Sequence, residues 1–179
     1  MLGPNLELAP WRPARARWLA DIDRRLRVAR PPVVVVADVQ DFYPSINPGS
    51  LTRALSGAGV TADDMAPVLT VLAWLREDGV QGLPIGPEPS AVLANAILAA
   101  TDRALRAAGA PHLRWVDDVV AFADDLPHAI RATDALRRSL RSAGLDLNDG
   151  KTRVIPDPAE ARSLLIPGIA SPASGPDVA

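Results

Sequence analysis

The run from Val33 to Ala37, with the sequence VVVVA, constrains the fold of this chain more than any other segment. It follows Pro31-Pro32, which end the preceding helical pattern, and it is followed by Asp38. A short continuous run of apolar, mostly β-branched residues is typical of a strand that is covered on both faces. The run therefore predicts a buried strand with Asp38 at its C-terminal end.

The remaining sequence predicts helices and three further strands from hydrophobic periodicity and turn signals. We expect helices over residues 14–29, 50–56, 61–79, 90–108 and 127–144, and strands over residues 112–116, 119–123 and 152–155. Pro44 and Asn47-Pro48-Gly49 are expected to form turns. The order strand, helices, strand, strand, helix, strand predicts an α+β fold of the ferredoxin-like β-α-β-β-α-β type, with extra helices after the first strand.

Three segments of the chain differ in composition. Residues 1–32 are predicted to form a basic N-terminal helical segment, in which arginines outnumber acidic residues although the whole chain has a net charge of −2. Such a segment indicates either an affinity for phosphates or an ordinary solvated helix face. Residues 33–155 are predicted to form the main domain. Residues 156–179, rich in Pro, Ala, Ser and Gly, are expected to be disordered.

Composition excludes several kinds of functional site. The chain has no cysteine, which excludes disulfides, zinc-thiolate sites and cysteine nucleophiles. Its two histidines are too few for the usual histidine-rich metal sites. The longest strongly apolar run, residues 33–37, is too short to span a membrane, and the N-terminus has no apolar signal region. We therefore expect a cytoplasmic protein without a membrane partner.

Three carboxylates are predicted to meet at one edge of the sheet. In the predicted topology the first and third strands are antiparallel neighbours, so Asp38 lies beside Asp117 and Asp118. Carboxylates that meet repel each other unless a cation lies between them. Oxygen ligands without histidine or cysteine select Mg²⁺ or Mn²⁺, and such a site suits two-metal displacement. An Asp-Asp pair by itself is also a common hairpin turn.

Four segments resemble motifs A to D of reverse transcriptases. Residues 38–46 (DVQDFYPSI) resemble motif A, and residues 82–86 (GLPIG) with Ser90 and residues 93–95 (LAN) resemble motif B. Residues 114–118 (RWVDD) resemble motif C, with Trp115 in place of the usual tyrosine. Residues 144–152 (GLDLNDGKT) resemble motif D. The resemblance covers residues 33–155 and is closest in character to the bacterial retron, abortive-infection and defence-associated group.

This resemblance implies a polymerase palm domain whose fingers and thumb are largely missing. The implied activity is that of an RNA-directed DNA polymerase, a nucleotidyltransferase that adds dNTPs to a 3′-hydroxyl by a two-metal mechanism. Asp38, Asp117 and Asp118 are then expected to hold Mg²⁺ or Mn²⁺, with the Val39 carbonyl as a further ligand. A role in anti-phage defence is an analogy from similar proteins.

Lys151 is expected to act as the acid that protonates the leaving pyrophosphate. It is the only lysine in a chain that otherwise uses arginine for its basic residues, and it falls where the family places that acid. Arginine cannot lose its proton in proteins, whereas the pKa of lysine can be tuned. An exposed loop lysine with no role in chemistry is the simpler alternative.

The resemblance also implies residues that bind the substrates. Tyr43, the only tyrosine, falls at the steric-gate position, where a flat ring would clash with a ribose 2′-hydroxyl, so dNTPs are expected. A core aromatic at the edge of a turn is the alternative reading of Tyr43. The remaining implied nucleotide-binding residues are Phe42, Pro84 and Gly86, and the implied template- and primer-binding residues are Ser90, Asn95 and Trp115.

The chain is expected to bind an RNA template, a DNA product and dNTPs. Only 37 residues precede Asp38 and 28 follow Lys151, which is too few for fingers and thumb. A bare palm should bind a primer–template weakly, because phosphate contacts dominate affinity for nucleic acids. We therefore expect a partner protein, self-assembly or a bound RNA to supply the missing parts. The alternatives are a non-catalytic palm-fold module that binds nucleic acid or protein, and another palm-type enzyme such as a nucleotide cyclase.

Overall fold

The computed structural model describes residues 11–28, 32–86 and 88–166. Its strands are β1 (Val33–Ala37), β2 (His112–Trp115), β3 (Asp118–Ala123) and β4 (Arg153–Ile155). They form one antiparallel sheet in the order β2-β3-β1-β4. The bounds of β1 are those predicted from the valine run, and the mixture of helices with this sheet agrees with the predicted α+β class.

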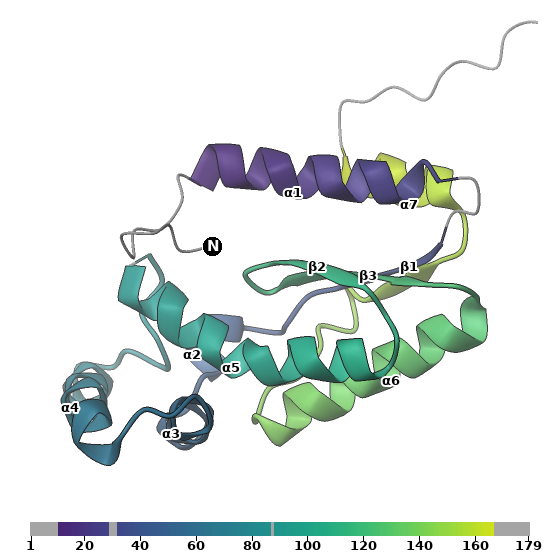
Figure 1. The fold of residues 1–179 in the computed structure, drawn as a ribbon. Coiled ribbons are helices and arrows are strands. Elements are labelled where there is room, and N and C mark those ends of the chain that lie inside the picture. The colour runs from purple at the N-terminus through teal and green to yellow at the C-terminus, as the bar shows by residue number, and fades with distance from the viewer. Residues whose placement is uncertain (1–10, 29–31, 87, 167–179) are drawn as a thin grey trace, which may run out of the picture.

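Helices cover both faces of the sheet (Figure 1). One face is covered by α5 (Glu88–Ala107) and α6 (Leu126–Ser142), and the other by α1 (Trp11–Leu26) and α7 (Pro158–Leu165). The remaining helices, which follow β1 in the chain and lie at one end of the molecule, are α2 (Phe42–Ser45), α3 (Pro48–Gly57) and α4 (Ala62–Glu77). None of the helices in the described ranges is long and apolar enough to cross a membrane.

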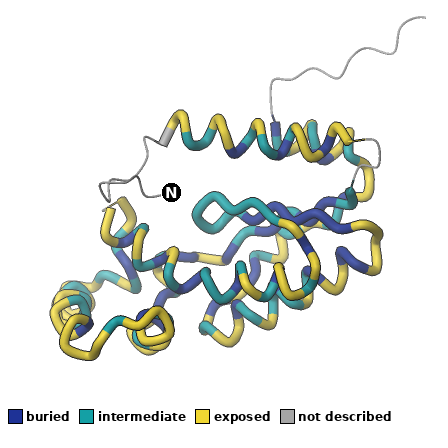
Figure 2. The backbone as a smooth tube through the Cα atoms, in the orientation of Figure 1, coloured by how far each residue is buried: buried dark blue, intermediate teal, exposed yellow. Residues whose placement is uncertain are grey.

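The strand β1 is central because both of its edges are paired. It pairs with β3 from Val33 opposite Ala123 to Ala37 opposite Val119, and with β4 on its other edge. Val35 and Ala37 belong to the apolar cluster on the α5–α6 side, whereas Val34 belongs to the cluster on the α1–α7 side. The run shows no polar–apolar alternation because helices cover both of its faces, as the sequence predicted. Figure 2 shows the burial concentrated in the sheet and in the inward faces of the helices.

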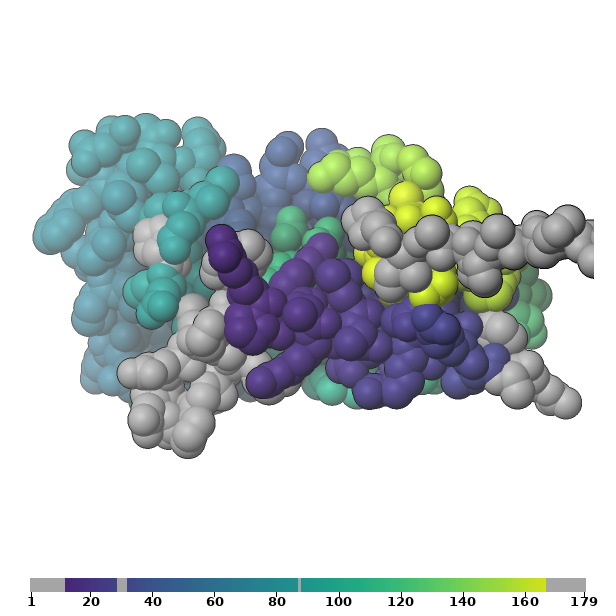
Figure 3. All heavy atoms as spheres, turned by 90° about the horizontal axis from the view of Figure 1, so that it is seen from above, coloured from purple at the N-terminus to yellow at the C-terminus, as the bar shows by residue number. Residues whose placement is uncertain are grey.

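The second sheet face is covered by α1 and α7 together. Trp18, Ile22 and Leu26 form an apolar stripe on α1, and they pack with Val34 and Phe122 of the sheet. The two helices lie side by side (Figure 3), where Arg162 of α7 donates to Asp23 of α1 at 2.6 Å. The helix predicted over residues 14–29 is therefore present, although it begins at Trp11 and ends at Leu26.

The prediction that residues 156–179 are disordered is wrong for the first part of that segment. Asp157 accepts a hydrogen bond from the amide of Ala159, and Pro158 occupies the first turn of α7. Ala161 and Ile166 are buried against α1 and the sheet. The composition of the whole segment concealed this short amphipathic helix, whose stability comes from packing. Residues 167–179, like residues 1–10 and 29–31, lie outside the described residues.

Two further local predictions differ from the structure. Residues 42–45, expected as part of a turn, form the short helix α2, which begins after Asp41 in a left-handed conformation with φ of 42°. The helix expected over residues 61–79 is present as α4, but Met65 is its only buried residue. The α4 helix packs mainly against α3 and does not reach the sheet, so its other apolar residues are only partly covered.

Candidate active site

The register of β1 and β3 brings three carboxylates to one edge of the sheet. Ala37 pairs with Val119, so Asp38 follows the last residue of β1 where Asp118 opens β3. Asp117 lies in the turn just before Asp118. It is close enough to both other carboxylates for their negative charges to raise its pKa. The structure thus places Asp38, Asp117 and Asp118 together, as the sequence predicted.

The turn between β2 and β3 has an unusual backbone. Trp115 pairs with Asp118, which leaves Val116 and Asp117 as the two central residues of a tight hairpin. Val116 has φ of 55°, a left-handed conformation that a β-branched residue rarely adopts. Such a conformation persists only where the surrounding structure holds it, and it is frequent at functional sites.

The carboxyl groups of this turn are in an environment that opposes their ionisation. Burial raises the pKa of Asp117 from its ordinary value of 3.8, and the charges of Asp118 and Asp38 raise it further. Burial also raises the pKa of Asp118, against the lowering effect of the nearby Arg15 guanidinium. Negative charge at this edge therefore needs a cation to balance it.

Two basic side chains meet this cluster. The Lys151 Nζ lies 3.3 Å from the Asp38 Oδ2, and only 15% of the Asp38 side chain is exposed. Arg15 of α1 places its Nη1 3.6 Å from the Asp118 Oδ2. Its guanidinium also lies over the ring of Trp18, 4.2 Å from the centroid, and 5.4 Å from that of Trp115. Arg15 was not predicted as a site residue.

A backbone bridge positions Lys151. Val39 forms an isolated antiparallel bridge with Leu147, and the Asn148 amide donates to the Asp38 carbonyl at 2.8 Å. The Asn148 carbonyl then accepts the amide of Lys151 at 3.1 Å, which closes a turn. The segment predicted as motif D is thereby held directly against the end of β1.

The chemistry of the cluster fits a hard divalent cation. Its side-chain donors are carboxylate oxygens alone, the ligands that Mg²⁺ and Mn²⁺ prefer. A cavity of about 300 Å³ borders Asp38, Asp118 and Lys151. No three acidic or histidine side chains of the described ranges are arranged around one point as metal ligands. Asp38 and Asp118 are instead directed to Lys151 and Arg15, so coordination by all three carboxylates requires these contacts to rearrange.

Tyr43 lies near the carboxylates, as the predicted nucleotide-binding role requires. Its pKa is raised by burial and by the negative charge of Asp117. The neighbouring Phe42 is buried in the core, and its ring meets that of Tyr43 edge-on, with centroids 5.3 Å apart. Phe42 therefore packs against the ring of Tyr43 from the side of the core. Because Phe42 is buried, this arrangement does not support the prediction that it contacts a nucleotide directly.

The loop predicted as motif B docks on the backbone of α2. The Leu83 amide donates to the Tyr43 carbonyl at 2.9 Å. Gly82 has φ of +63°, and a Cβ on it would lie 2.1 Å from the Tyr43 carbonyl oxygen. Only glycine allows this approach. The contact places the segment with Pro84 and Gly86 beside Tyr43, so the predicted nucleotide-binding residues share one neighbourhood.

The three residues predicted to bind template and primer are not gathered on one open surface. Ser90 is 4% exposed, so it offers almost no surface to a nucleic acid. Asn95 is exposed, but its side-chain amide contacts Arg114 and the Ala91 carbonyl. Trp115 lies 6.4 Å, between ring centroids, from Trp18 of α1. Their roles in binding nucleic acid stay predictions.

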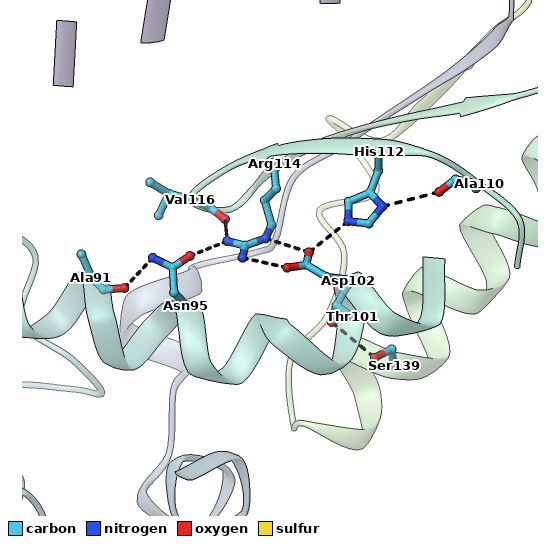
Figure 4. A network of polar contacts seen from close by, with 9 residues as sticks. All are labelled: Ala91, Asn95, Thr101, Asp102, Ala110, His112, Arg114, Val116 and Ser139. Atoms are coloured by element: carbon cyan, nitrogen blue, oxygen red, sulfur yellow. Dashed lines mark hydrogen bonds and ion pairs between the residues drawn. The ribbon is translucent and has the colours of Figure 1, made fainter. Parts of the chain in front are cut away.

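A polar network behind the turn was missed by the sequence reasoning. Arg114 joins Asn95 and Asp102 of α5 to the Val116 carbonyl, and His112 contacts the same Asp102 (Figure 4). The sequence carried one signal: Asn95 and Asp102 are two helical turns apart and so lie on one face of the predicted helix. Nothing in the sequence indicated that this face meets Arg114.

Comparison with models of protein families identifies a family for this chain. A family model described as reverse transcriptase (RNA-dependent DNA polymerase) matches residues 14–164. The matched range includes all residues of the site described above, and it extends into both α1 and α7. A search of curated proteins finds no match to the chain.

Proposed function

Because the chain belongs to the reverse transcriptase (RNA-dependent DNA polymerase) family, we propose that it is a nucleotidyltransferase that adds dNTPs to a primer 3′-hydroxyl on an RNA template in the cytoplasm. The observation that carries the proposal is the meeting of Asp38, Asp117 and Asp118 at one sheet edge. The sheet order β2-β3-β1-β4, with α5 and α6 on one face, supports a ferredoxin-like palm.

Asp38, Asp117 and Asp118 are the residues that we assign to Mg²⁺ or Mn²⁺, with the Val39 carbonyl as a further ligand. When bound, such ions make the 3′-oxygen a better nucleophile and offset the charge of the leaving pyrophosphate. The carboxylates supply fixed negative charge at the end of two paired strands. Their burial and mutual repulsion support the assignment, because a cation would relieve both.

Lys151 is proposed as the proton donor. The Lys151 side chain is 66% exposed and its Nζ contacts Asp38, so it lies at the site and in reach of solvent and substrate. The Nζ gives its proton to a pyrophosphate oxygen as the bond to the α-phosphate breaks. Bulk water then returns a proton to the lysine.

Tyr43 is proposed to select the sugar of the incoming nucleotide. Its ring packs edge-on against Phe42, and the loop at Gly82-Leu83 docks on its backbone carbonyl, so both the ring and the backbone of Tyr43 have packed neighbours. Pro84 and Gly86 follow in the same loop and are proposed to contact the nucleotide through their backbone. A rigid ring beside Asp117 supports exclusion of a 2′-hydroxyl.

Tight binding of a primer–template is proposed to need a partner protein, self-assembly or a bound RNA. The α4 helix supports such a contact because two of its large apolar side chains lie on the surface: Val71 is 50% exposed and Trp74 is 63% exposed. The biological setting that we propose, defence against phage, rests on the resemblance of the motifs alone. Its test is plaque formation on bacteria that express either the wild-type protein or the inactive variant described next.

The proposal is tested by incorporation of labelled dNTPs with Mg²⁺ or Mn²⁺, with and without an RNA template and primer. We expect metal-dependent product from the wild type and a loss of at least about 10³-fold in the Asp117→Asn/Asp118→Asn variant. Asp134→Asn, an exposed change on α6, is the matched control and should keep full activity. Product that persists in the double variant contradicts the proposal. Absence of product from the wild type, with Mn²⁺ still bound, points to a missing partner, whereas absence of both product and metal binding favours the non-catalytic binding module.

A further inference from the structure

The turn that carries Asp117 is held from behind by one arginine whose side chain is largely covered. Arg114 is the residue before Trp115 in β2, and 13% of its side chain is exposed. Its Nε and Nη2 each donate to one oxygen of the Asp102 carboxylate, both at 3.0 Å. This two-pronged contact fixes the plane of the guanidinium, because both hydrogen bonds must stay in line.

The third nitrogen of the guanidinium reaches the turn itself. Arg114 Nη1 donates to the Val116 carbonyl at 2.8 Å and to the Asn95 Oδ1 at 2.8 Å (Figure 4). The Val116 carbonyl belongs to the peptide group that joins Val116 to Asp117. A peptide group is planar, so holding its oxygen also sets the orientation of the Asp117 amide and Cα.

The clamp acts at the strained residue of the turn. Val116 has φ of 55°, a conformation that is strained for a β-branched residue. Without a partner for its carbonyl, the peptide is expected to rotate toward an ordinary conformation, and Asp117 would turn with it. The hydrogen bond from Arg114 to this carbonyl opposes such a rotation.

The anchor of the clamp stays charged over a wide pH range. Burial raises the pKa of Asp102, but the hydrogen bonds from His112 and Arg114 outweigh it and hold that pKa well below its usual range. The His112 Nε2 lies 3.2 Å from the Asp102 Oδ1, on the other side from the turn. The clamp therefore persists at any pH at which the site itself is charged.

We infer that Arg114, anchored by Asp102, is a positioning residue that fixes Asp117 for metal binding. The inference rests on the proposed function, because metal binding is the task for which Asp117 is positioned. Arg114 also links α5 to the turn, because its partners Asn95 and Asp102 both lie on that helix. A purely structural ion pair between α5 and β2 would stabilise the fold without affecting the metal.

The test compares Arg114→Gln and Arg114→Lys with the wild type, and uses Leu136→Val, a fully buried position on α6, as a control that destabilises the fold elsewhere. Mn²⁺ affinity of the full chain is measured by the electron paramagnetic resonance of unbound Mn²⁺, and the Tm of each variant is measured in parallel. We expect Arg114→Gln to weaken Mn²⁺ binding by about 10–100-fold, as is usual for partners behind a metal ligand. Arg114→Lys should be intermediate, because an ammonium cannot make the two-pronged contact and reach the turn at once.

The control variant separates an effect on the position of Asp117 from an effect on the stability of the fold. Leu136→Val is expected to lower the Tm while the Mn²⁺ affinity stays within about twofold of wild type. Equal Mn²⁺ affinity in the wild type and both Arg114 variants would overturn the inference, and if Arg114→Gln does not fold, Arg114→Lys decides. A wild type that binds no Mn²⁺ overturns both the inference and the proposed function. Arg114-dependent Mn²⁺ binding without any dNTP incorporation supports the inference and shows that the chain alone lacks the proposed activity.

Discussion

Tyr43 shows how several weak constraints fix one side chain. Its ring is half-buried, contacts Phe42 edge-on, and lies near enough to Asp117 for that charge to raise its pKa. Its carbonyl accepts the Leu83 amide, so its backbone is held as well. Aromatic pairs of this geometry add about 0.5–1.5 kcal/mol beyond the area that they bury. The ring is thus positioned before any nucleotide arrives.

Tyr43→Ala is expected to raise the use of ribonucleotides. Removal of the ring opens space for a 2′-hydroxyl, so the ratio of rNTP to dNTP incorporation should rise about tenfold or more. Tyr43→Phe keeps the ring and is the matched variant, for which we expect the wild-type ratio. The measurement is kcat/KM for one dNTP and its rNTP in each protein. An unchanged ratio in Tyr43→Ala would show that another residue selects the sugar.

At the scale of elements, the contact between α2 and the loop after α4 is a close approach of two backbones. The Gly82 Cα approaches the backbone of Tyr43 and Pro44 so closely that an added Cβ would lie 2.1 and 2.6 Å from their carbonyl oxygens. Two segments far apart in the sequence are therefore joined through main chain alone. This contact sets where the predicted nucleotide-binding loop begins.

Gly82→Ala is expected to destabilise the fold by about 1–3 kcal/mol, because the new Cβ meets backbone that cannot move away and φ is positive. Chemical denaturation measures this difference. Gly57→Ala is the matched control: it lies in α3 with nothing within 4 Å of an added Cβ, and it should stabilise by up to about 1 kcal/mol. A Gly82→Ala protein of wild-type stability would mean that the loop does not dock as described.

At the scale of the whole molecule, the candidate site reduces the stability of the domain. The carboxyl groups of Asp117 and Asp118 have raised pKa values, so the folded protein binds protons more tightly than the unfolded chain does. Their contribution to stability is present at a pH below their unfolded value of 3.8 and is lost as the pH rises through the folded values. Asp102, with its lowered pKa, contributes in the opposite sense and loses its contribution as the pH falls.

Mg²⁺ or Mn²⁺ is therefore expected to stabilise the protein more at neutral pH than at acidic pH. Ionised Asp117 and Asp118 attract the cation, whereas their protonated forms do not. The measurement is the Tm between pH 4 and 8 with and without about 10 mM Mg²⁺, which should raise the Tm by several degrees at pH 7 and by little at pH 4. The Asp117→Asn/Asp118→Asn variant should be more stable than wild type without metal and insensitive to it. An equal effect of Mg²⁺ on both proteins would contradict this account.

Much of this architecture could be predicted from local patterns. The run at β1 specifies a strand buried on both faces, because it has β-branched side chains and no polar alternation. The order of elements then predicts that β1 and β3 pair, and the pairing alone carries Asp38 to Asp117 and Asp118. These features follow from near neighbours in the sequence and from the few ways in which such strands connect.

Other features depend on surfaces that meet only after folding. The α7 helix is short and forms because Ala161 and Ile166 pack on α1 and the sheet, so its own composition did not reveal it. Arg15 reaches Asp118 from a different layer, and Arg114 reaches Asp102 across the space between β2 and α5. The sequence by itself thus determined the strand, the pairing and the meeting of the acids. Only the tertiary structure decided which cations face them and which arginine holds their turn, because side-chain partners in separate elements are chosen by the complementarity of whole surfaces.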